Sequence, residues 1–580
     1  MPNDGRTFSR NCFLIASLWL LAVGFCYYPK WTKPQTEATL SWDVSGYYLY
    51  LPAAFIYKDF RQQAFKDSIM RRYVPASDAY QSYRDSASGN MVMKYSMGMS
   101  LAYLPFFAAG HVVAHLSGHP ADGFSPPYQA AIGIGSLLVS LLGLHFLRRL
   151  LDRYVSSTAT GIVLLLYVFG THYLEYAAIT NAMSHSYLFT CYAGLLLLTI
   201  RYYEEPSRWR AAGIGALVGW MTLIRPTELL ALLLVLGWGI GSGAALKARL
   251  QLLARHRGHL LLAAAGLVLV GGLQPLYWKL VAGRWLVFSY TTDHFDFGAP
   301  HFSNALWSFR KGWWIYTPLM FLSVVGFAFL YRRPALFWPV LLFVLPFFYV
   351  TFSWSNWWYG GGLGQRALIQ VYPVLAFPLA ALIETVYRRR VRWLLLPVVL
   401  FCTYYNLWLH HQAHRGGLLE PEFMTYAYWK KIFLRYEVAP DARKLLDADE
   451  EYAGVPACPE LVFQSADTML LTAQVPYTPA VRVAPLEPKR WVRAEAVVWS
   501  ADPERYLWTM SQLVVREWKG GQVIKQNQLR AERLLEYGFG PKKVWLDLEL
   551  RDPRDSAEVF FYNTGSAKQL NITGLKVYRF

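Results

Sequence analysis

Charged residues are scarce in this sequence. Only 16% of its 580 residues are charged, whereas 54% are hydrophobic and 17% are aromatic. Soluble domains usually carry about 25% charged residues, so the composition excludes an ordinary soluble enzyme. The 38 acidic residues are outnumbered by 56 basic ones, and the formal net charge is +18. The basic residues are scattered between apolar runs, a pattern that does not favour a nucleic-acid-binding groove.

Cysteine is also scarce, and repeats are absent. Four of the five cysteines lie in or beside apolar runs, and Cys458 is alone in the polar C-terminal region. This distribution implies no disulfide framework. The sequence contains neither an internal repeat nor a low-complexity segment. No small-residue cleavage site follows the first apolar run, so we expect this run to remain as a membrane anchor.

Long apolar runs occupy roughly the first seven-tenths of the chain and then stop. A helix needs about 20 mostly apolar residues to cross a bilayer. By this measure the sequence predicts about eleven membrane spans, of which the one at 211–224 is short. The predicted spans are 12–28, 128–147, 157–177, 183–200, 211–224, 228–246, 260–282, 315–331, 335–352, 367–386 and 393–410.

Basic clusters give these spans an orientation. They follow the second, fourth, sixth, eighth and tenth spans, beginning at Arg148, Arg201, Lys247, Arg332 and Arg388. Because cytoplasmic loops are enriched in Lys and Arg, we expect a cytoplasmic N-terminus and an exported C-terminal region. The apolar run at 95–116 would invert every later loop if it crossed the membrane. We therefore expect it to lie in the outer leaflet, within a long exported loop over 29–127.

The C-terminal region has the alternation of a β-sheet protein. Its pattern predicts strands at 491–499, 507–518, 522–529, 543–550, 558–562 and 570–580, with a hairpin turn at Gly520-Gly521. We expect an exported β-sandwich over 476–580, preceded by a partly helical connector over 412–475. The predicted fold class is a polytopic α-helical membrane protein, over 1–411, with a C-terminal exported β-sandwich domain.

One acid lies among aromatic residues shortly after the first span. Asp43 follows Trp42 and precedes Tyr47 in the stretch 41–52. Aromatic rings cover the apolar faces of a pyranose and a carboxylate takes a proton from a hydroxyl, so the pattern suits a sugar site. Taken alone, it fits equally well an aromatic belt at the membrane interface with one solvated carboxylate.

Several cations are expected on the same side of the membrane. Lys94 opens the predicted surface helix, His185 begins the fourth span, Arg225 lies between the fifth and sixth spans, and Arg366 begins the tenth. Ionisable groups at span ends mark functional sites by default. These cations outnumber the nearby acids, and an anionic lipid-linked phosphate would pair with them. Individually, Lys94 could contact lipid phosphate, and His185 could be a hydrogen-bonded core residue.

The pattern resembles the GT-C superfamily of membrane glycosyltransferases, which take a sugar from a polyprenyl-phosphate carrier. It is most similar to the branch of protein O-mannosyltransferases and lipid A aminoarabinose transferases, over roughly residues 10–410. The resemblance rests on Asp43 in the first exported loop, the helix led by Lys94, the alternating spans and the Trp/Gly-rich loop before Arg366. Of the family's paired loop acids only Asp43 is matched, because Val44 follows it. Of the family's Lys-Pro-Pro-Leu motif only Lys94 is kept.

The resemblance implies an inverting sugar transfer from a polyprenyl-phosphate donor to a glycan, lipid or protein acceptor, on the periplasmic face of a bacterial inner membrane. Asp43 would be the general base. The donor phosphate would be bound by Lys94, Arg225, Arg366 and His185. The sugar and acceptor pocket would be lined by Trp42, Tyr47, Tyr290, Asp293, Trp357 and Trp358. The residues predict no metal site and leave a requirement for a divalent metal open.

Two other functions would use the same features. A transporter or flippase for a lipid-linked glycan needs the cations but no base, and a non-catalytic envelope assembly protein would act through its exported domain. Transporters are commonly built from two related halves with paired broken helices, whereas this sequence has no internal repeat. The long first loop favours an enzyme.

The predicted topology can be tested by cysteine labelling. Single cysteines at positions 118 and 207, in a background without the native cysteines, should fall on opposite sides of the membrane. We expect a membrane-impermeant reagent to label position 118 and not position 207, because the basic clusters place residue 207 in the cytoplasm. Labelling of position 207 alone would contradict this orientation.

Overall fold

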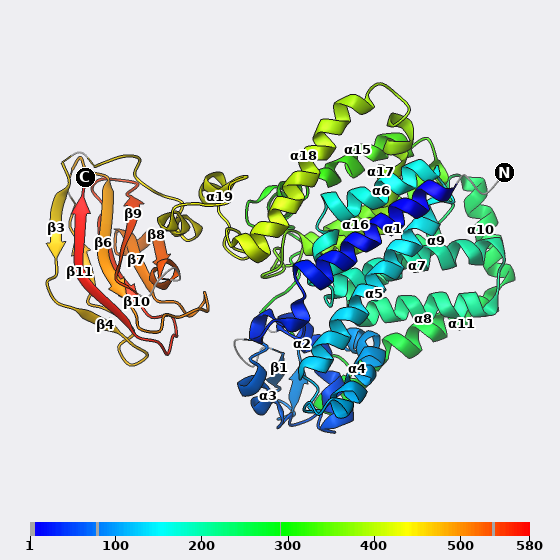
Figure 1. Cartoon of the computed structure of the whole chain (residues 1–580), viewed down its shortest axis with the longest axis horizontal. Coiled ribbons are helices and arrows are strands. Elements are labelled where there is room, and N and C mark those ends of the chain that lie inside the picture. The colour runs from blue at the N-terminus through cyan, green and yellow to red at the C-terminus, as the bar shows by residue number, and fades with distance from the viewer. Residues whose placement is uncertain (1–5, 77–80, 291, 457, 486, 536–539) are drawn as a thin grey trace. The chain divides into compact units, whose positions relative to one another are not determined.

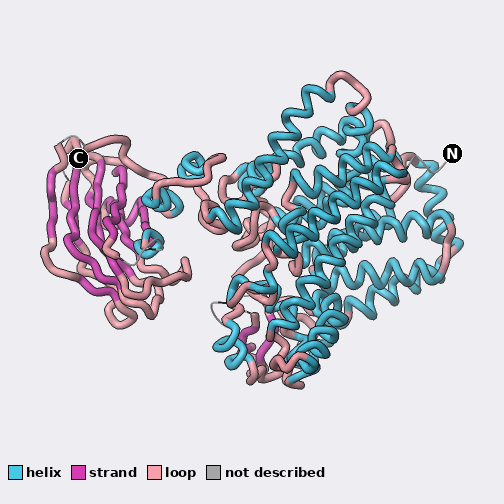
Figure 2. Tube along the Cα trace, in the orientation of Figure 1, coloured by secondary structure: helices cyan, strands magenta, loops and turns pink. Residues whose placement is uncertain are grey.

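Two compact units make up the chain in its computed structural model, Met1–His414 and Arg415–Phe580. The structure describes residues 6–76, 81–290, 292–456, 458–485, 487–535 and 540–580. The first unit is mainly helical, and all but two of the described strands lie in the second (Figure 2). The predicted order of a helical domain followed by a β domain is thus confirmed.

The first unit contains most of the helices. Its longer α-helices are α1 (Thr7–Ala22), α4 (Gly98–Leu116), α5 (Pro126–Leu151), α6 (Ser157–Gly170), α7 (Ser184–Glu204), α8 (Arg208–Ile224), α10 (Gly243–Arg255), α11 (Arg257–Gly271), α12 (Leu273–Ala282), α15 (Phe321–Leu330), α16 (Pro334–Phe352), α17 (Tyr372–Val386) and α18 (Arg392–His411). Shorter elements include α2 (Trp42–Tyr48), α3 (Lys66–Tyr73), α9 (Ala231–Gly237), α13 (Phe302–Trp307) and α14 (Trp313–Tyr316). Single π or 3-10 turns join them, among them η2 (Val23–Tyr27), η6 (Glu175–Ile179), η7 (Pro226–Leu230), η8 (Pro318–Met320), η9 (Arg366–Val371) and η10 (Gln412–Gly416).

The most deeply buried helix is α17. In an 18-residue stretch of the apolar segment Arg366–Val386, which joins η9 to α17, 94% of the residues are buried. The helix packs against α6, α7, α15 and α16 (Figure 1). An element that is apolar on all sides lies in a protein core or faces lipid, and this one is surrounded by other helices. The arginine at the start of this segment is therefore carried into the interior of the unit.

Helix α11 shows the opposite extreme. In an 18-residue stretch of the apolar segment Arg257–Ala282, which joins α11 to α12, only 11% of the residues are buried. Helix α11 packs mainly along α8. Gly215 of α8 permits this contact, because a Cβ atom there would lie 1.9 Å from the carbonyl oxygen of Ala263. Small residues allow such close approach between helices in membranes.

Seven helical segments in the described part of the chain are long and apolar enough to cross a membrane. They are Thr7–Thr32, Gly98–Leu116, Pro126–Leu151, Arg257–Ala282, Pro334–Phe352, Arg366–Val386 and Arg392–Gly416, and shorter apolar helices cover Ser157–Gly170, Pro226–Gly237 and Pro318–Leu330. These helices indicate that the first unit is membrane-embedded. The eleven crossings, their orientation and the surface position of 95–116 stay predictions.

The predicted first loop folds into a small layer at one end of the unit, where Figure 1 shows α2, α3 and β1 together. Strands β1 (Ser82–Arg84) and β2 (Met91–Met93) pair antiparallel. The hairpin is attached to the loop after α12, since Arg284 pairs with Asp85 at 2.5 Å and Asn90 donates to the carbonyl of Val281 at 2.8 Å. These contacts fix the position of Lys94, the first residue after β2.

The second unit is a two-layer β structure. One sheet has the strand order β5-β10-β7-β8, and the other has the order β3-β11-β6-β9 with β4 also paired to β11. The strands are β3 (Glu460–Gln464), β4 (Met469–Leu471), β5 (Val481–Val483), β6 (Trp491–Trp499), β7 (Gln512–Lys519), β8 (Gln522–Arg530), β9 (Lys542–Glu549), β10 (Ser556–Tyr562) and β11 (Leu570–Arg579). Alternate residues of β6 are buried, as expected for one face turned to a core. The core takes apolar side chains from both sheets.

The β7–β8 hairpin forms where the turn was predicted. Gly520 has φ +58° and Gly521 has φ +81°. Left-handed φ at both central residues defines the turn that matches the twist of paired strands. Glycine adopts this conformation without steric penalty, so the sequence alone located the turn.

The structure places the start of the β unit before residue 476. The segment 412–475, predicted as a connector, supplies β3 and β4. It also supplies Asp447, a fully buried carboxylate that pairs with Arg530 at 2.5 Å and with Arg533 at 3.2 Å. A buried acid needs such partners to offset the loss of its hydration. The sequence pattern could not indicate this, because the paired residues lie 83 positions or more apart.

Fragments of the second unit test this boundary. We expect residues 415–580 to fold alone with cooperative unfolding. A fragment of 476–580 lacks β3 and β4 and leaves two arginines without Asp447, so its free energy of unfolding should be lower by at least about 3 kcal/mol. Circular dichroism with urea denaturation of both fragments measures this difference. Equal stability would show that the upstream segment is only a connector.

Candidate active site

An ion pair joins α2 to η9. The Asp43 Oδ2 atom lies 2.7 Å from Arg366 Nη2, although the residues are 323 positions apart. The other carboxylate oxygen, Oδ1, accepts a hydrogen bond from the Tyr95 hydroxyl at 2.7 Å. The two paired side chains are only 13% and 14% exposed. Both oxygens of the predicted base are thus held by donors in a largely buried position.

The local backbone presents Asp43 to its partners. Ser41 is extended and Trp42 has φ +48°, so the chain turns sharply into α2 and places Asp43 in the first helical turn. An acid is favoured there by the helix dipole. Gly46 faces the ring of Tyr95, and a Cβ at position 46 would lie 2.4 Å from that ring. A side chain at this position would therefore displace the tyrosine that holds Asp43.

The environment keeps the Asp43 carboxyl ionised. Burial alone would raise its pKa, but the charge of Arg366, the hydrogen bond from Tyr95 and the charge of Lys94 together lower the pKa below its ordinary value. A carboxyl group with a lowered pKa remains charged at neutral pH. That is the state in which it can accept a proton.

Tyrosine rings and Lys94 surround the ion pair. The rings of Tyr47 and Tyr290 both meet Tyr95 edge-on, with centroids 4.8 and 6.0 Å away. Lys94 Nζ lies 5.7 Å from the ring centroid of Tyr95 and 5.6 Å from that of Tyr290. The Ser289 hydroxyl donates to the Lys94 carbonyl at 2.6 Å. The structure therefore brings Lys94, Tyr47 and Tyr290 to Asp43, as the sequence predicted.

A second cation lies close by. Arg225 follows α8 and precedes Pro226, which favours the extended backbone seen at φ −145°. Its Nη2 atom lies 3.5 Å from His185 Nε2, and its guanidinium is 5.9 Å from the ring centroid of Tyr359. Among the described residues, Arg225 forms no ion pair with a carboxylate. Its charge nevertheless reaches the same site: burial, Tyr47 and Asp43 raise the pKa of Tyr290, and the charge of Arg225 lowers it.

Tyr176 lies between His185, which contacts Arg225, and Arg366. Its ring centroid is 5.4 Å from that of His185, and its hydroxyl donates to the carbonyl of Leu363 at 3.0 Å. A Cβ at Gly362 would meet both the Tyr176 hydroxyl at 2.5 Å and Arg366 Cδ at 3.0 Å. The glycine-rich loop thus packs against protein side chains. The absence of a side chain at Gly362 makes room for Tyr176 and Arg366.

The remaining pocket residues have different neighbours. Trp357 is 8% exposed, and its carbonyl accepts a hydrogen bond from Gln365 at 3.1 Å. Trp358 lies under the Arg310 guanidinium, 3.8 Å from the ring centroid. Both tryptophans therefore stabilise the loop that precedes Arg366. Asp293 follows Tyr290 closely and is the last of the groups that raise the pKa of Tyr290, after burial, Tyr47 and Asp43. Trp42 is half-buried beside Asp43.

Sequence reasoning missed four residues of this site. Two are Tyr95 and Tyr176; the others are Gln370, which lies 3.3 Å from His185, and Glu228, which accepts a hydrogen bond from Gln370. Tyr95 directly follows Lys94, and Gln370 follows Arg366 by four residues, so proximity to a predicted residue was a usable signal for both. Glu228 is an acid at the start of a predicted span, which the rule for intramembrane ionisable groups would have selected. Tyr176 carried no such signal, because tyrosines are abundant near span ends.

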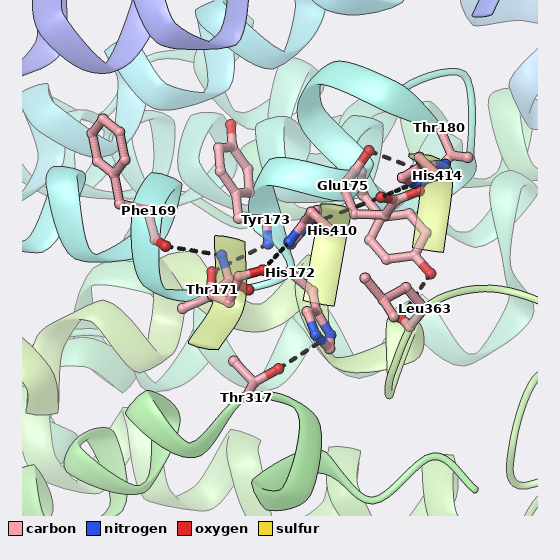
Figure 3. A network of polar contacts seen from close by, with 12 residues as sticks. Phe169, Thr171, His172, Tyr173, Glu175, Thr180, Thr317, Leu363, His410 and His414 are labelled. Atoms are coloured by element: carbon pink, nitrogen blue, oxygen red, sulfur yellow. Dashed lines mark hydrogen bonds and ion pairs between the residues drawn. The ribbon is translucent and has the colours of Figure 1, made fainter. Parts of the chain in front are cut away.

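A separate buried network lies around Glu175 (Figure 3). The Glu175 carboxylate is 2.7 Å from His414 Nε2, 2.9 Å from the Thr180 hydroxyl and 4.0 Å from His410 Nε2. Glu175 and Tyr176 belong to the π turn η6, and such turns are frequent at functional sites. The turn therefore directs one side chain to the histidines and the next toward Arg366. Sequence analysis did not identify this network.

No group of three or more His, Cys, Asp or Glu side chains that could hold a metal ion occurs in the described part of the chain. No protein-family model matches the sequence, and no curated protein matches it significantly. The case for a function rests on the residues themselves.

The Glu175 network gives a prediction for stability. Glu175→Ala removes the buried carboxylate that contacts His414 and Thr180, so the free energy of unfolding should fall by about 1–3 kcal/mol for each polar group left without this partner. Thermal unfolding in detergent measures the change. Glu205, whose carboxylate is 77% exposed and pairs with Arg210 at 2.9 Å, supplies the control, since Glu205→Ala should cost no more than about 1 kcal/mol. Similar shifts for both variants would contradict a structural role for Glu175.

Proposed function

We propose that the first unit transfers a sugar from a polyprenyl-phosphate carrier to an acceptor hydroxyl, with inversion at the anomeric carbon. The observation that carries this proposal is the ionised Asp43 carboxylate, which lies among tyrosines and cations in a membrane-embedded helical unit. A lipid-linked donor needs cations for its phosphate, aromatic surface for its sugar and a base for the acceptor. All three occur together here.

The reaction is a single displacement. The acceptor oxygen attacks the anomeric carbon and forms the glycosidic bond, the bond from that carbon to the phosphate oxygen breaks, and Asp43 takes the hydroxyl proton. A carboxylate of low pKa is a weak base. It suffices because the hydroxyl becomes strongly acidic as its oxygen bonds to the carbon. The polyprenyl phosphate leaves with the bonding electrons, and nearby cations stabilise its charge.

The contacts divide the predicted phosphate-binding residues into two roles. Arg366 is already paired with Asp43, so its task is to hold the base in place and ionised. Arg225 has no carboxylate partner among the described residues and Lys94 lies over two tyrosine rings. These two cations are the groups that would bind the donor phosphate by charge-assisted contacts.

The arginine clusters between the apolar helices support a site on the periplasmic face of a bacterial inner membrane. In that orientation the β unit is exported on the same side as Asp43. The acceptor would then be a glycan, lipid or protein of the cell envelope.

The proposal is tested at Asp43. Asp43→Asn keeps the size and a hydrogen-bonding oxygen but cannot accept a proton, so turnover should fall by roughly 100-fold or more while donor binding persists. Glycosyl transfer from a lipid-linked sugar by the purified protein measures turnover. Asp67→Asn, an exposed acid on α3 in the same loop, is the matched control and should leave turnover unchanged. Near wild-type turnover in Asp43→Asn would remove its assignment as the base, and donor binding without any transfer by the wild type would favour a transporter.

A further inference from the structure

The proposed reaction gives no role to Glu228, a buried acid close to Arg225. Glu228 is fully buried in η7, three residues after Arg225, at the start of the apolar segment Pro226–Gly237. A carboxylate in such a position is costly and is kept only where partners hold it and a function needs it.

Two donors hold the Glu228 carboxylate. The Tyr192 hydroxyl donates to Oε2 at 2.6 Å, and the Gln370 amide nitrogen donates to Oε1. The side chains of Tyr192 and Gln370 are themselves at most 1% exposed. Because an ionised carboxylate has no hydrogen to donate, the amide nitrogen of Gln370 is the atom that faces Oε1. This sets the orientation of the Gln370 amide.

The orientation of Gln370 determines which nitrogen of His185 carries a proton. The Gln370 carbonyl oxygen, Oε1, lies 3.3 Å from His185 Nδ1, so Nδ1 must donate. The other ring nitrogen, Nε2, is 3.5 Å from Arg225 Nη2. A guanidinium group can only donate, so Nε2 must be unprotonated. All contacts are satisfied only when the hydrogen bonds run from Arg225 through His185 and Gln370 to Glu228.

We propose that Glu228 is a positioning residue for Arg225, acting through Gln370 and His185. This inference rests on the proposed function, in which Arg225 binds the donor phosphate. It changes the role predicted for His185, whose outward nitrogen accepts from Arg225 and so cannot donate to the phosphate. The backbone contributes a second tie, since the Glu228 N–H donates to the Arg225 carbonyl at 2.9 Å.

The test interrupts this chain without changing its length. Gln370→Met is nearly isosteric but removes both polar atoms, so His185 can adopt the other tautomer and direct an N–H toward Arg225. We expect the full-length protein to bind undecaprenyl phosphate about tenfold more weakly than the wild type. In an Arg225→Ala background the same change should have no further effect, because the residue it positions is gone.

A pair of Glu228 variants gives an independent measurement. Glu228→Gln keeps an oxygen that can accept from Gln370, so its affinity for undecaprenyl phosphate should stay within about threefold of the wild type. Glu228→Met has no such oxygen and should reproduce the loss seen in Gln370→Met. Retained affinity in Glu228→Gln and lost affinity in Glu228→Met would show that the effect comes from the direction of the hydrogen bonds and not from a change in packing.

The control is Asn406→Leu. Asn406 lies on α18, and its buried side-chain amide donates to the Phe169 carbonyl at 2.9 Å. The substitution should lower thermal stability without changing affinity. Wild-type affinity in Gln370→Met, or an equal loss in the presence and absence of Arg225, would overturn the positioning role while leaving the proposed function intact. If the wild type itself bound no undecaprenyl phosphate, the proposed function would fail.

Discussion

The Asp43–Arg366 ion pair is the interaction on which the candidate site depends. It joins a short helix in the first loop to the beginning of the most buried helical segment, across 323 positions of sequence. Either charge without the other would destabilise the fold, because a largely buried charge loses its hydration and needs an opposite charge to offset that loss. Together they fix the loop layer on the helices and keep the carboxylate ionised. The same contact therefore serves both the fold and the proposed chemistry.

Around this pair, the polar contacts of the site join segments that are distant in the sequence and meet only in the folded unit. Tyr95 from the first loop holds Asp43, and Tyr176 from η6 packs beside Arg366. Close approach requires glycine at positions 46 and 362, where a side chain would collide with these tyrosines. The glycines thus determine how closely the polar groups can approach one another.

The second unit uses the same principle within a β structure. Asp447 is a buried acid that lies upstream of the strands and is held by arginines of the sheet region. Its pairing makes the preceding segment part of the β unit. In both units, a charge that appears isolated in the sequence is explained by a cation distant in the chain. The physical reason is common to both, since burial of a charge demands a partner.

The sequence by itself determined the features that depend on local pattern. Apolar runs located the membrane-embedded helices, strand alternation located β6 to β11, and Gly520-Gly521 located a hairpin, because each follows from periodicity or backbone preference over a few residues. It also selected Asp43, Lys94, Arg225, Arg366 and His185 as polar residues that need an explanation. Only the tertiary structure decided their partners. Arg366 pairs with the acid, His185 faces Arg225, and Glu228 enters through Gln370, since hydrogen-bond partners are set by packing between distant segments, which no local pattern encodes.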